Sequence, residues 1–344
     1  MIKTIEYSQV EKNDIENKYV LVDVRSPKEF SDSTIPGAVN VPLFTNEQRE
    51  LIGTVYVRES IEKAKKIGVE AASKNLPGIY DKINELNKNY KGLVFFCARG
   101  GMRSSSVVGF VEALGVRAFK LDKGYKGYRA YINEQLPYTV SDIKFVVIHG
   151  NTGVGKTNIL KRLEEQGHDI LDLEGYANHR GSLLGSVGLG EQNSQKQFES
   201  LVYDKLKNRK SNLVFVEGES RRIGKIMIPD YIFNSMKSGE HIKVTADIDL
   251  RVKNILADYV QNDDSELIES LNKLRKYISE KNIDKYIDEV SKKNYEYVIR
   301  ELMIKYYDPM YENNKYDFRL TLEHKDIDET CNIIVDWAKS NLEF

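Results

Sequence analysis

Cysteine is scarce in this sequence, with Cys97 and Cys331 as the two thiols among 344 residues. Two such residues form no disulfide framework, which excludes a disulfide-stabilised secreted domain. The five histidines are scattered without metal-ligand spacing, so we expect no zinc site. No stretch reaches the roughly 18 apolar residues of a membrane span, and the first residues lack the basic-then-apolar order of a signal peptide. We therefore expect a cytoplasmic protein with reduced thiols and no membrane partner.

The sequence also lacks an excess of either charge. Lys and Arg together number 51 and Asp and Glu 52, which leaves a formal net charge of -1. A nearly neutral chain is no generic polyanion binder, so any nucleic-acid partner must be held by a local basic surface. An apolar content of 41% over this length supports a sizeable core and favours two domains.

Short apolar runs indicate an α/β fold in the first part of the chain. YVLVDV (19–24) and GLVFFC (92–97) do not alternate with polar residues, as is typical of buried parallel strands. The charged segment 46–86 between them is predicted to be helical, and a further helix is predicted to begin near Ser104 and to end at Gly115. The pattern relaxes near residues 133–142, where Pro137 interrupts it. We therefore expect one parallel-sheet domain over 1–138, with a helical insertion at about 44–90, and a second domain over 139–344.

The second part repeats the alternation of strands and helices. Strands are predicted for Lys144–His149 and within HDILDLEG (168–175), NLVFVEGE (212–219) and HIKVTADI (241–248). Helices are predicted at 156–166 and 194–208, and long helical stretches rich in Tyr, Lys and Glu finish the chain. This order predicts a P-loop NTPase-like α/β domain with a helical C-terminal extension.

The sequence GNTGVGKT fits the pattern G-x-x-x-x-G-K-[ST] in full, and it lies between a predicted strand and a predicted helix. The motif comprises Gly150, Asn151, Thr152, Gly153, Val154, Gly155, Lys156 and Thr157. Glycines let backbone N–H groups converge on phosphate oxygens, and the helix N-terminus and the lysine add positive charge. We therefore expect a di- or triphosphate here.

A magnesium ion is an open possibility at this loop. Thr157 would place its hydroxyl on the ion, and Glu217 at the end of a neighbouring strand would complete the shell. The alternative is that Glu217 caps a turn or pairs with Arg221 or Arg222. The motif also leaves the reaction open, because the same loop can hold a nucleotide or a pyrophosphate that departs from carbon.

Cys97 stands where a predicted strand ends and a charged loop begins. That loop continues as Ala98, Arg99, Gly100, Gly101, Met102, Arg103 and Ser104. Neighbouring cations and a helix N-terminus lower the pKa of a thiol, and adjacent glycines let amides surround the sulfur. We therefore expect Cys97 to be a nucleophile that carries an anionic atom. Cys331 shares a helical face with Ile327, Ile334, Val335 and Ala338, which predicts core packing.

Several motifs carry a resemblance to known families. LVDVRSPKEF (21–30), IPGAVNVP (35–42) and the cysteine loop resemble a rhodanese domain, whose loop cysteine accepts a chalcogen atom as a persulfide. A rhodanese-like half followed by a P-loop half resembles the tRNA 2-selenouridine synthase family. The resemblance spans nearly the whole chain and includes KGYKGYRAY, LDLEGYANHRGSLLGS, QNSQKQFE and FVEGESRRIG.

The resemblance implies a two-step modification of the wobble uridine in tRNA. In that family 2-thiouridine is geranylated on sulfur by geranyl diphosphate and is then converted to 2-selenouridine by selenophosphate. It implies that the P-loop holds the diphosphate and that Cys97 takes selenium as an S-selanyl intermediate. The partner is the tRNA anticodon loop that bears 2-thiouridine.

Two further groups of residues are candidates for contacts with these substrates. Basic and aromatic residues that could grip phosphate and stack a base, or form a solvated charged edge, are Arg117, Lys120, Lys123, Tyr125, Lys126, Tyr128 and Arg129. Tyrosines between positions 286 and 311 are another candidate surface or half-buried packing. Residues expected near the phosphate site, to bind the uridine, the prenyl chain or magnesium, are Asp172, Glu174, His179, Arg180, Glu217 and Glu219.

Two other functions compete with this interpretation. The complete P-loop motif also suits a rhodanese sulfurtransferase fused to an ATP-dependent kinase or ATPase. A non-catalytic alternative is a nucleotide-switched binding module, in which Cys97 would be dispensable.

Overall fold

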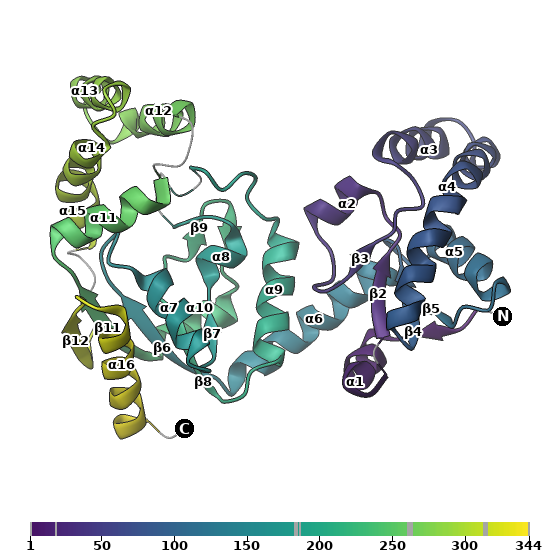
Figure 1. Cartoon of the computed structure of the whole chain (residues 1–344), viewed down its shortest axis with the longest axis horizontal. Helices are drawn as coiled ribbons and strands as arrows, with labels where there is room; N and C mark the ends of the chain where they lie inside the picture. Colours follow the sequence, from purple (N-terminus) through teal and green to yellow (C-terminus); the bar gives the residue numbers. More distant parts are fainter. Residues whose placement is uncertain are drawn as a thin grey trace. The chain divides into compact units, whose positions relative to one another are not determined.

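The computed structural model describes residues 2–17, 19–181, 185, 187–259, 264–311 and 316–342. The chain divides into two compact units, one of Met1–Leu136 with Glu199–Leu201 and the other of Pro137–Phe198 with Val202–Phe344. Each unit is built on a five-stranded parallel sheet (Figure 1). The predicted α/β class is therefore confirmed for both parts of the chain.

The two apolar runs 19–24 and 92–97, which the sequence predicts as strands, both form strands of the sheet in unit 1. Its strand order is β1-β5-β4-β2-β3, with the bounds β1 Thr4–Ile5, β5 Ala118–Leu121, β4 Gly92–Phe96, β2 Tyr19–Asp23 and β3 Val39–Asn40. All four pairings are parallel. Every residue of β4 is buried, because helices cover both faces of a parallel sheet.

The helices of unit 1 are α1 Tyr7–Asn17, α2 Pro27–Asp32, α3 Asn46–Arg58, α4 Ile61–Asn89, α5 Met102–Ala113 and α6 Gly124–Ser141, whose last five residues from Pro137 belong to unit 2. The predicted helical insertion is thus two helices, because Thr45 caps α3 and Ser60 caps α4 with their side-chain oxygens. Helices α3 and α4 pack against each other (Figure 1). Helix α5 begins at Met102, earlier than expected, and Gly115 follows it with a φ of 83° as a helix-ending glycine does.

The predicted interruption at Pro137 is wrong. Pro137 lies inside α6, which continues to Ser141. A proline in a helix removes one backbone hydrogen bond and is unfavourable by about 3 kcal/mol. Ile132, Leu136 and Val140 lie four residues apart on one buried face of α6, and their packing outweighs that loss.

Unit 2 has the strand order β12-β11-β6-β8-β7, again entirely parallel. The bounds are β6 Lys144–His149, β7 Ile170–Leu171, β8 Leu213–Glu217, β11 Glu240–Thr245 and β12 Leu320–Glu323. A separate hairpin pairs β9 Arg222–Ile223 with β10 Ile226–Met227. Strand β12 lies in the part of the chain that the sequence predicts as helical, so that part of the prediction is wrong.

The main helices of unit 2 include α7 Lys156–Glu165, α8 Leu173–Ala177, α9 Gln195–Lys207, α10 Asp230–Lys237, α11 Ile248–Tyr259, α12 Asp264–Lys273, α13 Glu280–Ser291, α14 Tyr295–Leu302, α15 Asp308–Tyr311 and α16 Ile327–Asn341. Cys331 on α16 is fully buried in the sheet core with Ile334 and Ala338, which confirms its predicted packing role. Tyr286 and Tyr307 lie in a separate buried cluster of the C-terminal helices, so their rings act in packing. No helix in the described part of the chain is both long and apolar enough to span a lipid bilayer.

Candidate functional sites

The cysteine loop joins β4 to α5 and packs tightly on the first turn of α6. The N–H of Tyr125 donates to the carbonyl of Cys97 at 2.9 Å, and that of Lys126 donates to Ala98 at 3.0 Å. Gly124 has a φ of 56°, and a Cβ there would collide with the Cys97 carbonyl and the Gly100 nitrogen. Gly124 therefore permits a close approach that fixes the backbone of the cysteine.

The environment of Cys97 favours the thiolate. Burial raises the pKa of this thiol, but hydrogen bonds from Ser104 and from the backbone of Arg99, together with the charge of Arg103, outweigh burial and lower it. The Ser104 hydroxyl lies 3.3 Å from Cys97 Sγ. Because the thiolate is the nucleophilic form of cysteine, this geometry suits Cys97 to attack or carry an electrophilic atom.

The two loop arginines have different roles. Arg103 donates to both carboxylate oxygens of Glu29, at 2.6 and 3.1 Å, and so ties the start of α5 to α2. Burial raises the pKa of Glu29, but the bond and charge of Arg103 lower it overall. The side chain of Arg99 is exposed and makes no hydrogen bond or ion pair with any residue that the structure describes. Arg99 is therefore the arginine free to meet an anionic substrate.

The P-loop lies between β6 and α7, as the motif predicts. Gly153 and Gly155 have φ values of 85° and 89°, which favour glycine. A Cβ at Gly150 would lie 2.6 Å from both Val154 and the carbonyl of Val244, so no larger residue fits there. The ammonium of Lys156 donates to the Gly150 carbonyl at 3.1 Å and thus folds back across the loop.

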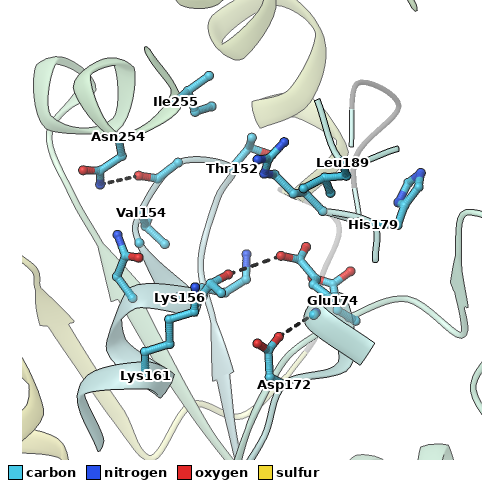
Figure 2. Close-up of a pocket in the computed structure, with 18 of the residues that line it drawn as sticks. Thr152, Val154, Lys156, Lys161, Asp172, Glu174, His179, Leu189, Asn254 and Ile255 are labelled. Atoms are coloured by element: carbon cyan, nitrogen blue, oxygen red, sulfur yellow. Dashed lines mark hydrogen bonds between the residues drawn. The ribbon is translucent and has the colours of Figure 1, made fainter. Parts of the chain in front are cut away.

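Residues far along the chain hold the P-loop in place. Arg251 on α11 donates to the Thr152 carbonyl at 2.9 Å and pairs with Asp308 at 2.6 Å. Asn151 also donates to Asp308, at 3.0 Å. Asn254 donates to the Gly153 carbonyl at 2.9 Å (Figure 2). Arg251, Asn254 and Asp308 are not predicted from the sequence, because no motif marks a contact that joins a loop to distant helices.

A cavity of about 270 Å³ lies against the P-loop. Its lining includes five of the six residues expected there, namely Asp172, Glu174, His179, Arg180 and Glu219. Figure 2 labels Asp172, Glu174 and His179 among them. The carboxyl ends of parallel strands meet at one edge of the sheet, which explains why these side chains converge. Glu217 is fully buried and is not part of the lining.

The carboxyl groups at this cavity keep protons more readily than usual. Burial, then repulsion from Glu219, raises the pKa of Glu174 to about 8. Burial and the neighbouring acids raise the pKa of Glu217 well above its usual range, and burial raises those of Asp172 and Glu219. One oxygen of Glu217 accepts from the backbone of Glu174 at 2.7 Å, and the other has no hydrogen-bond partner among the described residues. A bound cation would therefore relieve an unfavourable concentration of acids.

Thr157, which is predicted to hold a magnesium ion together with Glu217, contacts another carboxylate in the structure. Its hydroxyl donates to Glu174 at 3.3 Å, whereas one oxygen of Glu217 accepts from the Glu174 backbone. The magnesium ligands therefore stay a prediction. The start of α8 places Glu174 there, with Asp172 capping that helix through a 2.7 Å bond from Gly175. In the described ranges of the chain, no group of three or more His, Cys, Asp or Glu is arranged to hold a metal ion.

The predicted role of Tyr125 and Tyr128 in stacking a base is wrong for this structure. Both rings are buried, with Arg25 4.4 Å above the Tyr125 ring and Tyr7 4.7 Å from Tyr128. The start of α6 packs this face into unit 1, so neither ring offers a surface to RNA. Of the basic candidates, Arg117, Lys123 and Lys126 are exposed, and Lys120 and Arg129 are half-buried. Their role in binding tRNA stays a prediction.

Comparison with known proteins identifies both parts of the chain. Residues 143–341 match the profile of the family described as tRNA 2-selenouridine synthase AAA domain, and residues 6–131 match that of the rhodanese-like domain. A protein from Nitrosomonas europaea named tRNA 2-selenouridine synthase is 35% identical over 250 residues, which cover 70% of this chain and 63% of that protein. A protein of the same name from Bdellovibrio bacteriovorus is 33% identical over 273 residues, which cover 76% of this chain and 69% of that protein.

A solved structure is also similar in sequence to part of this chain. The N-terminal domain of a protein from Clostridium difficile 630 is 37% identical, with a TM-score of 0.36, and the match covers 38% of this chain and 98% of that one. The aligned part of the present chain spans somewhat less than two thirds of the Nitrosomonas europaea relative.

Proposed function

Because the chain belongs to the tRNA 2-selenouridine synthase family, we propose that it is an enzyme that converts 2-thiouridine at the wobble position of tRNA to 2-selenouridine. The observation that carries this proposal is a thiol of lowered pKa and a phosphate-binding loop in one chain. The balanced reaction takes 2-thiouridine, geranyl diphosphate, selenophosphate and water to 2-selenouridine, geranylthiol, pyrophosphate and orthophosphate. The cytoplasm remains the expected location.

In the first step the sulfur of 2-thiouridine attacks the allylic carbon of geranyl diphosphate. The carbon–oxygen bond breaks, and pyrophosphate leaves with the electron pair. The backbone N–H groups of residues 151–157 and the ammonium of Lys156 would stabilise the growing negative charge. Alkylation makes the sulfur a better leaving group from C2 of the base.

A bound diphosphate would bring a magnesium ion to this first site, because magnesium is commonly held by one or two protein groups together with phosphate oxygens. Glu174 and Thr157 are the residues that would hold it, since their side chains meet at the edge of the cavity. The ion would supply Lewis acidity at the diphosphate. Its positive charge would also offset the repulsion between Glu174 and Glu219, whose pKa values burial raises.

In the second step Cys97 carries selenium as an S-selanyl group. Hydrolysis of the selenium–phosphorus bond of selenophosphate releases orthophosphate and selenide. The Cys97 thiolate first attacks the disulfide of a small thiol, which forms a mixed disulfide on Cys97 and releases one thiolate. Selenide then attacks the Cys97 sulfur of that mixed disulfide, and the small thiol leaves as thiolate. This exchange forms the sulfur–selenium bond without a further oxidant.

The carried selenium then replaces sulfur on the base. Selenium attacks C2, the bond from C2 to the geranylated sulfur breaks, and geranylthiolate leaves with the electron pair and takes a proton. The small thiol next attacks the Cys97 sulfur, which frees 2-selenouridine and restores the mixed disulfide. The cycle therefore neither gains nor loses electrons.

Nucleoside mass spectrometry of 2-thiolated tRNA incubated with variants tests this division of labour. Cys97→Ser should abolish 2-selenouridine and accumulate S-geranyl-2-thiouridine, because serine cannot carry selenium. Lys156→Ala should lower the rate of geranylation by about 10²-fold or more, as loss of a group that stabilises developing charge does. Cys331→Ala, at the buried second thiol, is the matched control and should keep both activities.

Two results would contradict the proposal. If Cys97→Ser and Lys156→Ala both kept both activities, neither loop would serve this reaction. If the wild type hydrolysed ATP without geranyl diphosphate and formed neither nucleoside, a sulfurtransferase fused to an ATPase would explain the two loops better.

A further inference from the structure

Unit 1 contains a large pocket beside Cys97 that the two steps above leave unexplained. Its volume is about 930 Å³, at the upper end of the range for ligand sites. Helices α3 and α4 line one side, and the loop from Cys97 to Arg103 lines the other. The pocket lies entirely within residues 43–106, so unit 1 forms it alone.

The lining from α3 and α4 is mostly apolar, and small residues leave a hollow in it. Ala64, Gly68, Ala72 and Leu76 follow at intervals of four along α4, so three small residues share one face of the helix and leave space there. Apolar side chains remain exposed around this space, with Val57 at 83% and Val69 at 70% of full exposure. A contiguous apolar surface of this kind is typical of a binding site for an apolar group.

The charged groups of the pocket are all cationic. Arg49, Lys65, Arg99 and Arg103 contribute to its lining, which contains no Asp or Glu. Arg49 and Arg103 are paired with Glu29, and Lys65 with Glu62, so Arg99 is the cation without a partner among the described residues. Apolar walls beside a cationic rim match a ligand that joins a hydrocarbon chain to an anionic nucleotide.

We propose that this pocket binds the prenyl chain of the S-geranylated nucleotide while Cys97 delivers selenium. The inference rests on the proposed function, since it names the site for that reaction's intermediate. Selenium on Cys97 bonds to C2 as the bond from C2 to sulfur breaks, so the prenylated sulfur departs close to Cys97. Its chain must therefore lie beside the cysteine, where this pocket opens.

A filling substitution and a matched control test the inference. An added Cβ at Gly68 meets Phe44 and Ile52 at 3.7 and 3.9 Å, which is ordinary contact, so Gly68→Leu places its side chain in the pocket without backbone strain. Gly78 lies on the same helix, outside the lining, and an added Cβ there meets nothing within 4 Å. Both substitutions replace glycine by a better helix former, so neither should unfold α4.

Calorimetric titration with S-geranyl-2-thiouridine 5′-monophosphate measures binding without any turnover. We expect the wild type and Gly78→Leu to bind this nucleotide equally and Gly68→Leu to bind it at least 10-fold more weakly. The S-methyl analogue should bind all three proteins alike and more weakly than the geranyl nucleotide binds the wild type. Equal binding of the geranyl nucleotide by Gly68→Leu and the wild type would overturn the inference.

Turnover of pre-geranylated tRNA with selenophosphate gives a second measurement. Gly68→Leu should form 2-selenouridine at least 10-fold more slowly than Gly78→Leu. If the wild type binds the geranyl nucleotide through this pocket but never forms 2-selenouridine, the proposed function fails while the pocket assignment stands. A wild-type dimer that Gly68→Leu dissociates, with binding unchanged, would assign the pocket to a second copy and overturn the inference.

Discussion

At the scale of single residues, the reactivity of Cys97 depends on a few short contacts. The hydroxyl of Ser104, the backbone of Arg99 and the charge of Arg103 together overcome the effect of burial on the thiol. Cys331 shows the opposite balance, because burial and Asp328 raise its pKa to about 11. Two cysteines in one chain thus differ in chemistry because of what surrounds each sulfur.

Ser104→Ala should raise the pKa of Cys97, because the hydroxyl that favours the thiolate is removed. The rate of alkylation by iodoacetamide should then reach its midpoint at a pH higher by on the order of one unit. Mass spectrometry of the alkylated peptides reports Cys97 separately from Cys331. Ser106→Ala is the control, since Ser106 is exposed and makes no described bond to the thiol. An unchanged midpoint in Ser104→Ala would show that the hydroxyl does not stabilise the thiolate.

At the scale of elements, the C-terminal helices support the P-loop. Arg251 on α11 is buried and joins the Thr152 carbonyl to Asp308 at the start of α15. Asn254 and Asn151 add bonds of the same kind. The helical extension therefore supports the phosphate site, because residues of α11 and α15 fix the backbone and side chains of the glycine loop.

Asp308→Ala should loosen the P-loop, because it leaves the Arg251 guanidinium buried without its partner. We expect a loss of roughly 3 kcal/mol in the stability of unit 2 and weaker binding of inorganic pyrophosphate. Thermal unfolding and calorimetric titration measure the two effects. Asp317→Ala removes an exposed carboxylate that also pairs with an arginine, at 3.5 Å, and should change stability by less than about 1 kcal/mol. Equal stability and pyrophosphate affinity in the two variants would argue against a supporting role for Asp308.

At the scale of the whole molecule, the described residues that line each pocket belong to a single unit. The lining beside Cys97 lies within residues 43–106, and that of the P-loop cavity within 152–255. The first lining therefore belongs to unit 1 and the second to unit 2. The two chemical steps can therefore take place on separate copies of the protein, provided that the geranylated tRNA dissociates between them.

Neither Cys97→Ser nor Lys156→Ala should convert 2-thiolated tRNA fully by itself. A mixture of the two variants should form 2-selenouridine. The first variant supplies geranylated tRNA, and the second supplies selenation. Time courses of the nucleosides by mass spectrometry should show S-geranyl-2-thiouridine rising before 2-selenouridine. A mixture no more active than the separate variants would mean that both loops must act within one chain.

The sequence by itself determined the chemistry-bearing loops and most of the strands. GNTGVGKT and the cysteine loop are local patterns, and their glycines mark the positions where the backbone must turn sharply. Both loops lie between a strand and a helix, as predicted. Apolar runs without alternation likewise predicted β2, β4, β6 and β8, because burial on both faces leaves no polar positions. The family resemblance drawn from these motifs is also confirmed.

The tertiary structure alone decided which side chains meet. Tyr125 and Tyr128 look like an RNA-stacking stripe in sequence, but the packing of α6 buries them. Asp308 accepts a hydrogen bond from Asn151, which lies more than 150 residues away in the sequence. Nothing in the sequence marks Gly68 as a pocket residue, and only the fold shows that it faces Phe44 and Ile52. Local patterns specify local geometry, whereas contacts between distant segments depend on how the elements pack, and no short stretch of sequence encodes that.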